Sequence, residues 1–144
     1  GYGLSYTTFS YNNMKVDNSN GLYTITVDVK NTGNKAGRNV VELFVAAPNS
    51  KKLNKPEKEL RDYTKTRLLQ PGETETVTMI VSTADLASFN EKQSAWITDA
   101  GMYNFLVCSS SDKVEAQSSV AVKKYKQKVH NVLKPQVKLN LLRR

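Results

Sequence analysis

Residues 21–47, GLYTITVDVKNTGNKAGRNVVELFVAA, decide the fold of this chain. In the first half, Ile25, Val27 and Val29 alternate with polar residues, a period of two that predicts a strand with one buried and one solvated face. The second half, residues 40–46, also alternates but carries apolar residues on both faces, so we expect its outer face to be partly covered. The link at 31–37 is longer than the two-residue turn of a tight hairpin. It therefore allows the chain to cross between sheets, as in an antiparallel β-sandwich.

Length and composition limit the possible functions. A chain of 144 residues suits one domain that buries roughly two thirds of its unfolded surface. No apolar run approaches the roughly 18 residues that would suggest a membrane span, so we expect no membrane association. Cys108 and His130 are the single cysteine and the single histidine. We therefore expect no internal disulfide, no histidine-based triad, no zinc site and no cofactor.

The net charge of +8 is confined to the C-terminal tail. Residues 1–122 contain thirteen Lys or Arg and thirteen Asp or Glu, whereas residues 123–144 contain eight basic residues and no acidic one. The tail also carries six regularly spaced apolar side chains: Val129, Val132, Leu133, Val137, Leu139 and Leu141. A solvated basic arm has no need of these side chains. We therefore expect the tail to dock on a partner surface, with polyanion binding as an alternative and no nucleic-acid motif in the chain.

Further strands are expected on either side of the central pair. A first strand is expected from Phe9 to about residue 16. The polar, proline- and lysine-rich residues 48–66 predict a long exposed loop that leads into an edge strand. The segment 82–89 predicts one helical turn that is capped by Thr83, with Leu86 and Phe89 closing over the edge of the core.

The aromatic residues near the C-terminal end of the body favour an immunoglobulin-like sandwich. Trp96 is expected at the core or its edge. The Asp-x-Gly turn at Asp99 leads into a strand with Tyr103 and Phe105 on one face, a pattern that resembles a tyrosine corner. Cys108 falls on the opposite face and is interpreted as a small apolar filler. Together the patterns predict about seven or eight strands with one short helical turn, an antiparallel β-sandwich at residues 1–122 and an extended tail at 123–144.

Several sequence blocks carry a resemblance to a known family. They are GYGLSYTTF at 1–9, VKNTGNKAGRNVVELFVAAP at 29–48, KPEKELRDYTKTRLLQPGETETV at 55–77, DLASFNEKQSAWITDAGMYNFLVCSSS at 85–111 and NVLKPQVKLN at 131–140. Together they cover nearly the whole chain. The chain resembles the fibronectin type III-like C-terminal domain of family 3 glycoside hydrolases, the β-glucosidase and β-xylosidase family, of the bacterial periplasmic type.

This resemblance implies that the chain is one domain of a larger hydrolase. In such enzymes a catalytic barrel and an α/β sandwich supply the aspartate nucleophile, the glutamate acid/base and the sugar pockets, and none of their motifs occurs here. The carboxylates of Glu57 and Glu59 lie among lysines, which favour the ionised form and not a general acid. We therefore expect no catalytic residue in this chain. The parent is expected to hydrolyse β-linked sugars and to be periplasmic or secreted.

The expected role is to support the catalytic domains of the same parent chain. Eight residues are expected at the interdomain contact: Tyr2, Leu4, Tyr6, Val132, Leu133, Val137, Leu139 and Leu141. Four aromatic residues are expected to be structural: Phe89, Trp96, Tyr103 and Phe105. One alternative is an interaction module that acts in homodimerisation of the parent or through the 48–63 loop near the substrate entrance. A second is glycan binding by exposed aromatics, which we do not expect of this chain alone; the candidates are Tyr2, Tyr6, Tyr63, Trp96 and Tyr125.

Overall fold

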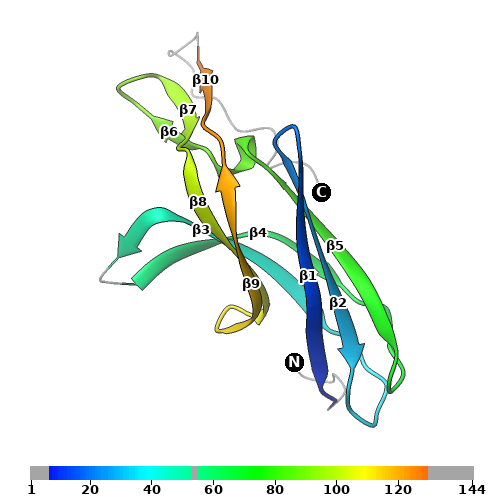
Figure 1. The fold of residues 1–144 in the computed structure, drawn as a ribbon. Coiled ribbons are helices and arrows are strands. Elements are labelled where there is room, and N and C mark those ends of the chain that lie inside the picture. The colour runs from blue at the N-terminus through cyan, green and yellow to red at the C-terminus, as the bar shows by residue number, and fades with distance from the viewer. Residues whose placement is uncertain (1–6, 53–54, 130–144) are drawn as a thin grey trace.

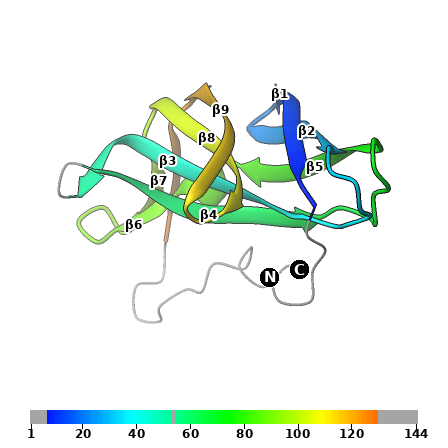
Figure 2. The same cartoon turned by 90° about the horizontal axis from the view of Figure 1, so that it is seen from below.

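Two antiparallel sheets pack against each other in the computed structural model, which describes residues 7–52 and 55–129 (Figures 1 and 2). One sheet has the strand order β1-β2-β5 and the other has the order β4-β3-β8-β9. The strands of the first sheet are β1 (Phe9–Ser19), β2 (Leu22–Asn31) and β5 (Thr74–Ser82). Those of the second sheet are β3 (Val40–Lys52), β4 (Lys55–Lys65), β8 (Gly101–Ser110) and β9 (Lys113–Val122). This arrangement confirms the predicted all-β sandwich.

The core lies between the sheets and follows the alternation seen in the sequence. Ile25, Val27 and Val29 of β2 are fully buried, and the aromatic rings of Tyr23 and Phe105 meet edge to face with centroids 5.7 Å apart. Strands β2 and β3 belong to different sheets, so the 31–37 link crosses between the two layers as predicted.

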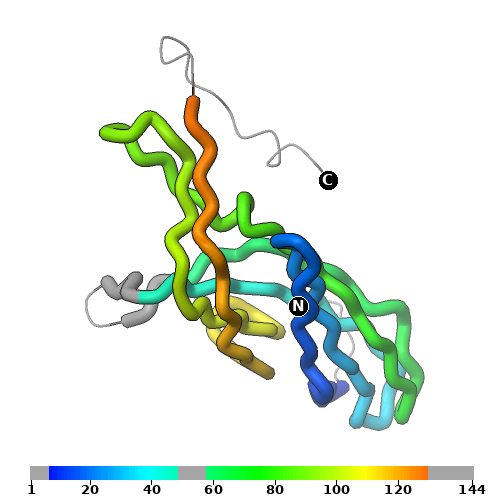
Figure 3. Tube along the Cα trace, turned by 45° about the horizontal axis from the view of Figure 1, so that its top comes forward, coloured from blue at the N-terminus to red at the C-terminus, as the bar shows by residue number. Residues whose placement is uncertain are grey.

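A third, smaller sheet extends one end of the sandwich (Figure 3). It has the order β10-β7-β6, with β6 at Ser88–Asn90, β7 at Ala95–Thr98 and β10 at Tyr125–Lys128. Gly101 pairs with Val122 and Thr98 pairs with Tyr125, so the β7–β10 pair continues the β8–β9 ladder beyond a short break. The described residues therefore form ten strands instead of seven or eight, and the first residues of the predicted tail form one of them.

The predicted loop at 48–66 is wrong, because most of this segment forms a β-hairpin. Strand β3 continues to Lys52, and β4 returns from Lys55 along it, with Lys52 paired to Lys55. Strand β4 lies at the edge of its sheet, as predicted for its second half. An edge strand tolerates lysine and the missing N–H of Pro56, because one side of its backbone needs no strand partner.

Strand β5 is an edge strand of the three-stranded sheet, and acidic side chains from β4 and from β5 itself bond to backbone groups along the boundary between β4 and β5. The backbone N–H of Ile80 donates a 3.0 Å hydrogen bond to the carboxylate of Asp62 on β4. Beyond β4, the N–H of Arg67 donates to the carboxylate of Glu75 at 2.8 Å. Carboxylates therefore accept hydrogen bonds from backbone groups that no neighbouring strand reaches.

The helical turn is the short 3₁₀ helix η1 (Ala84–Leu86), and its predicted cap is wrong. The hydroxyl of Thr83 donates instead to the carbonyl of Gly21, at 3.2 Å. The cap is a reciprocal pair in which the Asp85 N–H donates to the Ser82 hydroxyl and the Ser82 N–H donates to the Asp85 carboxylate. This is the geometry of a capping box, in which each side chain satisfies the other residue's amide.

Candidate interaction surfaces

The eight predicted interdomain contact residues lie outside the described residues. Their contacts therefore stay a prediction. The described chain begins at Thr7, and its first residues, Thr7 and Thr8, are bonded to the end of β2 and to the 31–37 link.

The attachment centres on Asn31, a fully buried polar residue at the end of β2. Its side-chain amide donates to the carbonyls of Lys35, at 2.7 Å, and Leu69, at 2.9 Å. Its side-chain oxygen accepts hydrogen bonds from the hydroxyl of Thr7, at 2.8 Å, and from the N–H of Gly33, at 2.9 Å. One side chain thus joins the N-terminal segment, the 31–37 link and the segment before β5. Asn31 was not predicted as a structural residue, although a polar residue that continues the inward alternation of β2 is a usable signal.

Gly33 allows the N-terminal segment to lie directly on the link. A Cβ atom at this position would fall 2.0 Å from the hydroxyl oxygen of Thr7 and 2.9 Å from the backbone nitrogen of Thr8. Thr32 completes the contact, because its N–H donates to the carbonyl of Thr8 at 2.8 Å. Only a residue without a side chain fits here while the segment keeps this position.

The predicted tyrosine corner is confirmed. The hydroxyl of Tyr103 donates a 2.8 Å hydrogen bond back to the carbonyl of Asp99, and burial is the main cause that raises the pKa of this hydroxyl. Phe105, two residues further, is fully buried. Tyr103 and Phe105 therefore hold the first half of β8 in place, Tyr103 through its hydrogen bond and Phe105 through its burial in the core.

Phe89 and Trp96 lie on the small sheet and not over the main core. Leu86 is buried at the core edge as predicted, but Phe89 is 43% exposed, so the expectation that Phe89 also closes this edge is wrong. The rings of Phe89 and Trp96 meet edge to face at 5.3 Å, from directly opposed positions of β6 and β7. A hollow of about 190 Å³ opens beside Phe89, lined by Ser88, Asn90, Gln93, Ile97, Asp99 and Lys124.

The described residues offer no assembled metal centre. No three of their His, Cys, Asp and Glu side chains gather closely enough to hold a metal ion. The carboxylate of Glu59 is 63% exposed and forms an ion pair with Arg61. A general acid of a glycosidase needs a desolvated site near a second carboxyl group. The exposed surroundings of Glu59 differ from such a site. Within residues 7–52 and 55–129, no helix reaches the length and apolar character needed to cross a membrane.

Cys108 is buried on the outer face of the four-stranded sheet, together with Phe44 and Leu106. Lys58 lies over this cluster, with its Nζ atom 4.7 Å from the centroid of the Phe44 ring, and donates to the carbonyl of Ser111 at 2.6 Å. The turn between β8 and β9 is thereby tied to β4. Burial raises the pKa of the Cys108 thiol, in keeping with the predicted filler role.

These features define a class of protein: an immunoglobulin-like β-sandwich with a tyrosine corner and a small third sheet at one end. Residues 39–111 match the family model described as a fibronectin type III-like domain. The chain belongs to this family, in the form found in family 3 β-glucosidases.

Relatives in sequence and in structure agree on this assignment. The chain is 41% identical over 126 residues to a β-glucosidase of Kluyveromyces marxianus, covering 86% of this chain and 15% of that protein. In structure it is similar to β-glucosidase 3B of Thermotoga neapolitana in complex with α-D-glucose, with a TM-score of 0.78 and 37% identity over 89% of this chain and 18% of that one. For the GH3 β-glucosidase of Bifidobacterium adolescentis the TM-score is 0.73, with 28% identity over 85% of this chain and 18% of that one. The chain therefore spans only about one sixth of the relatives it matches.

Proposed function

We propose that this chain is a non-catalytic domain of a β-glucosidase and that it stabilises the catalytic part of the same polypeptide. The observation that carries the proposal is the match of nearly the whole chain to only 15% of a β-glucosidase. The described residues are consistent with this role, because their polar contacts hold strands, turns and the entering segment. The names of the matched relatives favour a β-glucoside over a β-xyloside as the substrate of the parent.

The direct test removes residues 1–144 from the parent enzyme. We expect the midpoint of thermal unfolding of the remaining protein to fall, with loss of activity on an aryl β-glucoside as the catalytic part unfolds. The purified chain alone is expected to hydrolyse no aryl β-glucoside. Unchanged thermal stability of the shortened enzyme, or hydrolysis by the chain alone, would contradict the proposal.

A second candidate function is that of an interaction module, acting in dimerisation, at the substrate entrance or on glycans. The β3–β4 hairpin and the polar hollow beside Phe89 favour it, since an aromatic edge next to amide and carboxylate groups offers both apolar contact and hydrogen bonds. Removal of the hairpin tip would then change oligomer size or substrate preference at unchanged stability. Glycan binding would alter the fluorescence of Trp96, the single tryptophan, on titration with cello-oligosaccharides, and Phe89→Ala would weaken that response.

Within this proposal the parent is periplasmic or secreted. Fractionation of the source cells tests this independently of the domain's role.

A further inference from the structure

The outer faces of the two sheets differ in chemistry. On the β1-β2-β5 sheet, the residues that alternate with the core positions are mostly threonines and charged residues: Lys15, Asp17, Leu22, Thr24, Thr26, Asp28, Lys30, Thr74, Thr76, Thr78 and Ile80. Leu22 and Ile80 are the exceptions, two large apolar side chains that are 44% and 46% exposed. A face of this composition is suited to solvent.

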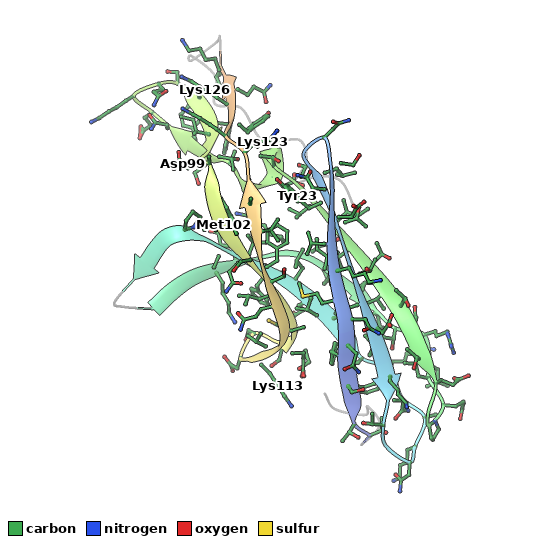
Figure 4. The ribbon with its side chains drawn as sticks, viewed as in Figure 1. Tyr23, Asp99, Met102, Lys113, Lys123 and Lys126 are labelled. Carbon is green, nitrogen blue, oxygen red and sulfur yellow. The ribbon has the colours of Figure 1, made fainter. Side chains whose placement is uncertain are left out.

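The outer face of the β4-β3-β8-β9 sheet is apolar over adjacent strands. Leu60, Phe44 and Leu106 form one row across three strands, because Phe44 is paired with both of the others. The neighbouring row contains Tyr63 and Val114 at its two ends. Met102 lies on the same face, on the side of β8 opposite to the core residue Tyr23 (Figure 4).

This face is only partly covered by the chain itself. Lys58 and the β8–β9 turn lie over its centre, but four large apolar side chains stay open to solvent: Leu60 at 47%, Tyr63 at 61%, Met102 at 56% and Val114 at 43%. We name these four residues the apolar outer patch. Leu60 and Tyr63 are near neighbours on β4, whereas Val114 on β9 and Met102 on β8 stand apart from them. Several large apolar side chains exposed on one face of a sheet favour an interaction surface.

An unsatisfied polar atom lies on the same face. One carboxylate oxygen of Glu42, which stands between Tyr63 and Cys108 in the sheet, is buried and accepts no hydrogen bond from the described residues. A buried acceptor without a donor is costly, and a donor supplied by a partner removes that cost.

We propose that the apolar outer patch is the surface by which this domain docks on the rest of its parent polypeptide. The inference rests on the proposed function, and adds to it the face that makes the contact. The partner that covers the patch is inferred from the length of the relatives, because the chain covers only 15% and 16% of two relatives that it matches. Most of such a protein is tethered to this domain, and a tethered partner has a far higher effective concentration than a second copy in solution.

The test measures how fast cysteines on the two outer faces of the full-length parent react with a maleimide. The variants are Leu60→Cys and Tyr63→Cys on the patch. Ile80→Cys is the matched control, since Ile80 is an apolar strand residue as exposed as Leu60 but on the polar outer face. Peptide mass spectrometry assigns the label to its site, so other cysteines of the parent do not interfere.

We expect both patch cysteines to react at least about tenfold more slowly than the control, because labelling then requires the docked domain to open. Equal labelling rates at all three positions would overturn the choice of face. In that case, a loss of thermal stability on removal of the whole domain would still support the proposed function. Protection that disappears on dilution of an oligomer into monomers would assign the patch to a second copy and overturn the proposal. Unchanged stability of the shortened enzyme would instead reject the proposed function itself.

Discussion

The hydroxyl of Tyr103 donates a hydrogen bond to the backbone carbonyl of Asp99, four residues earlier in the chain, at 2.8 Å. The bond spans the break between β7 and β8 and holds the small sheet in line with the sandwich.

Removal of this hydroxyl is expected to lower stability. Tyr103→Phe should reduce the free energy of unfolding by about 0.5–1.5 kcal/mol, the usual net value of one hydrogen bond. Denaturant unfolding of the purified chain measures this. Tyr125→Phe is the control, because the hydroxyl of Tyr125 bonds to Gln127 on the exposed surface. An equal loss of unfolding free energy in both variants would show that the hydrogen bond of the tyrosine corner stabilises the domain no more than an exposed one does.

Loss of the Asn31 amide is expected to cost more. Asn31→Ala leaves the carbonyl of Lys35 and the N–H of Gly33 without their partner, whereas the carbonyl of Leu69 keeps its hydrogen bond from the Gly37 N–H. Each buried group left unsatisfied costs about 1–3 kcal/mol, so we expect a total loss above about 2 kcal/mol in denaturant unfolding. Asn104→Ala is the control, because its amide hydrogen bond with Gln117 is exposed. A loss no larger than that of Asn104→Ala would contradict the role of Asn31.

A side chain at position 33 is expected to push the N-terminal segment off the link. Gly33→Ala should destabilise by about 1–3 kcal/mol, as overpacking does, and speed amide exchange at Thr32, whose N–H is bonded to Thr8. Gly72→Ala is the control: its φ of +85° is unfavourable for alanine, but a Cβ there meets nothing within 4 Å. That variant should lose stability without faster exchange at Thr32. Slow exchange at Thr32 in Gly33→Ala would refute the steric explanation.

Acid is expected to weaken the three-stranded sheet through Asp28. Hydrogen bonds from the Thr76 hydroxyl and the Asn13 amide lower the pKa of this carboxyl in the folded state. A group with a lower pKa in the folded than in the unfolded state stabilises at neutral pH, and this contribution is lost as the pH falls below about 4. In a series of thermal unfolding midpoints against pH, Asp28→Asn should show a smaller acid-induced drop than the unmodified chain. An unchanged drop in Asp28→Asn would contradict the assignment.

Lys58 is expected to protect Cys108. Removing its side chain in Lys58→Ala releases the turn at Ser111 and uncovers the Phe44 ring, so a thiol reagent should reach Cys108 faster. Lys113→Ala is the control, since that side chain is 72% exposed and its nearest contact to Glu115 is 3.9 Å. Equal labelling rates in the two variants would show that Lys58 does not cover the thiol.

The sequence predicted those parts of the fold in which burial alone dictates the residue pattern. The alternation of Ile25, Val27 and Val29 leaves no other strand face for the core, and the Asp-x-Gly turn before Tyr103 permits the corner. The first half of β4 was missed because an edge strand is stabilised by backbone pairing with β3, which tolerates lysine and proline.

The candidate surfaces were harder to predict. Asn31 satisfies groups that are distant in the chain, such as the carbonyl of Leu69, and no local pattern shows that pairing. Leu60 and Tyr63 lie in the segment interpreted as a loop, so their common face with Phe44 emerged only from the strand register. The predicted tail contacts lie outside the described residues and stay predictions.

The hydrogen bond from the Ile80 amide to the Asp62 carboxylate limits how copies of this domain can associate. A free β-strand edge invites a strand from another molecule, and repeated recruitment of this kind builds fibrils. Because the carboxylate of Asp62 already accepts the hydrogen bond of the Ile80 N–H, an incoming strand cannot pair with that N–H without displacing it. This side-chain hydrogen bond therefore hinders polymerisation through the β5 edge without altering either sheet.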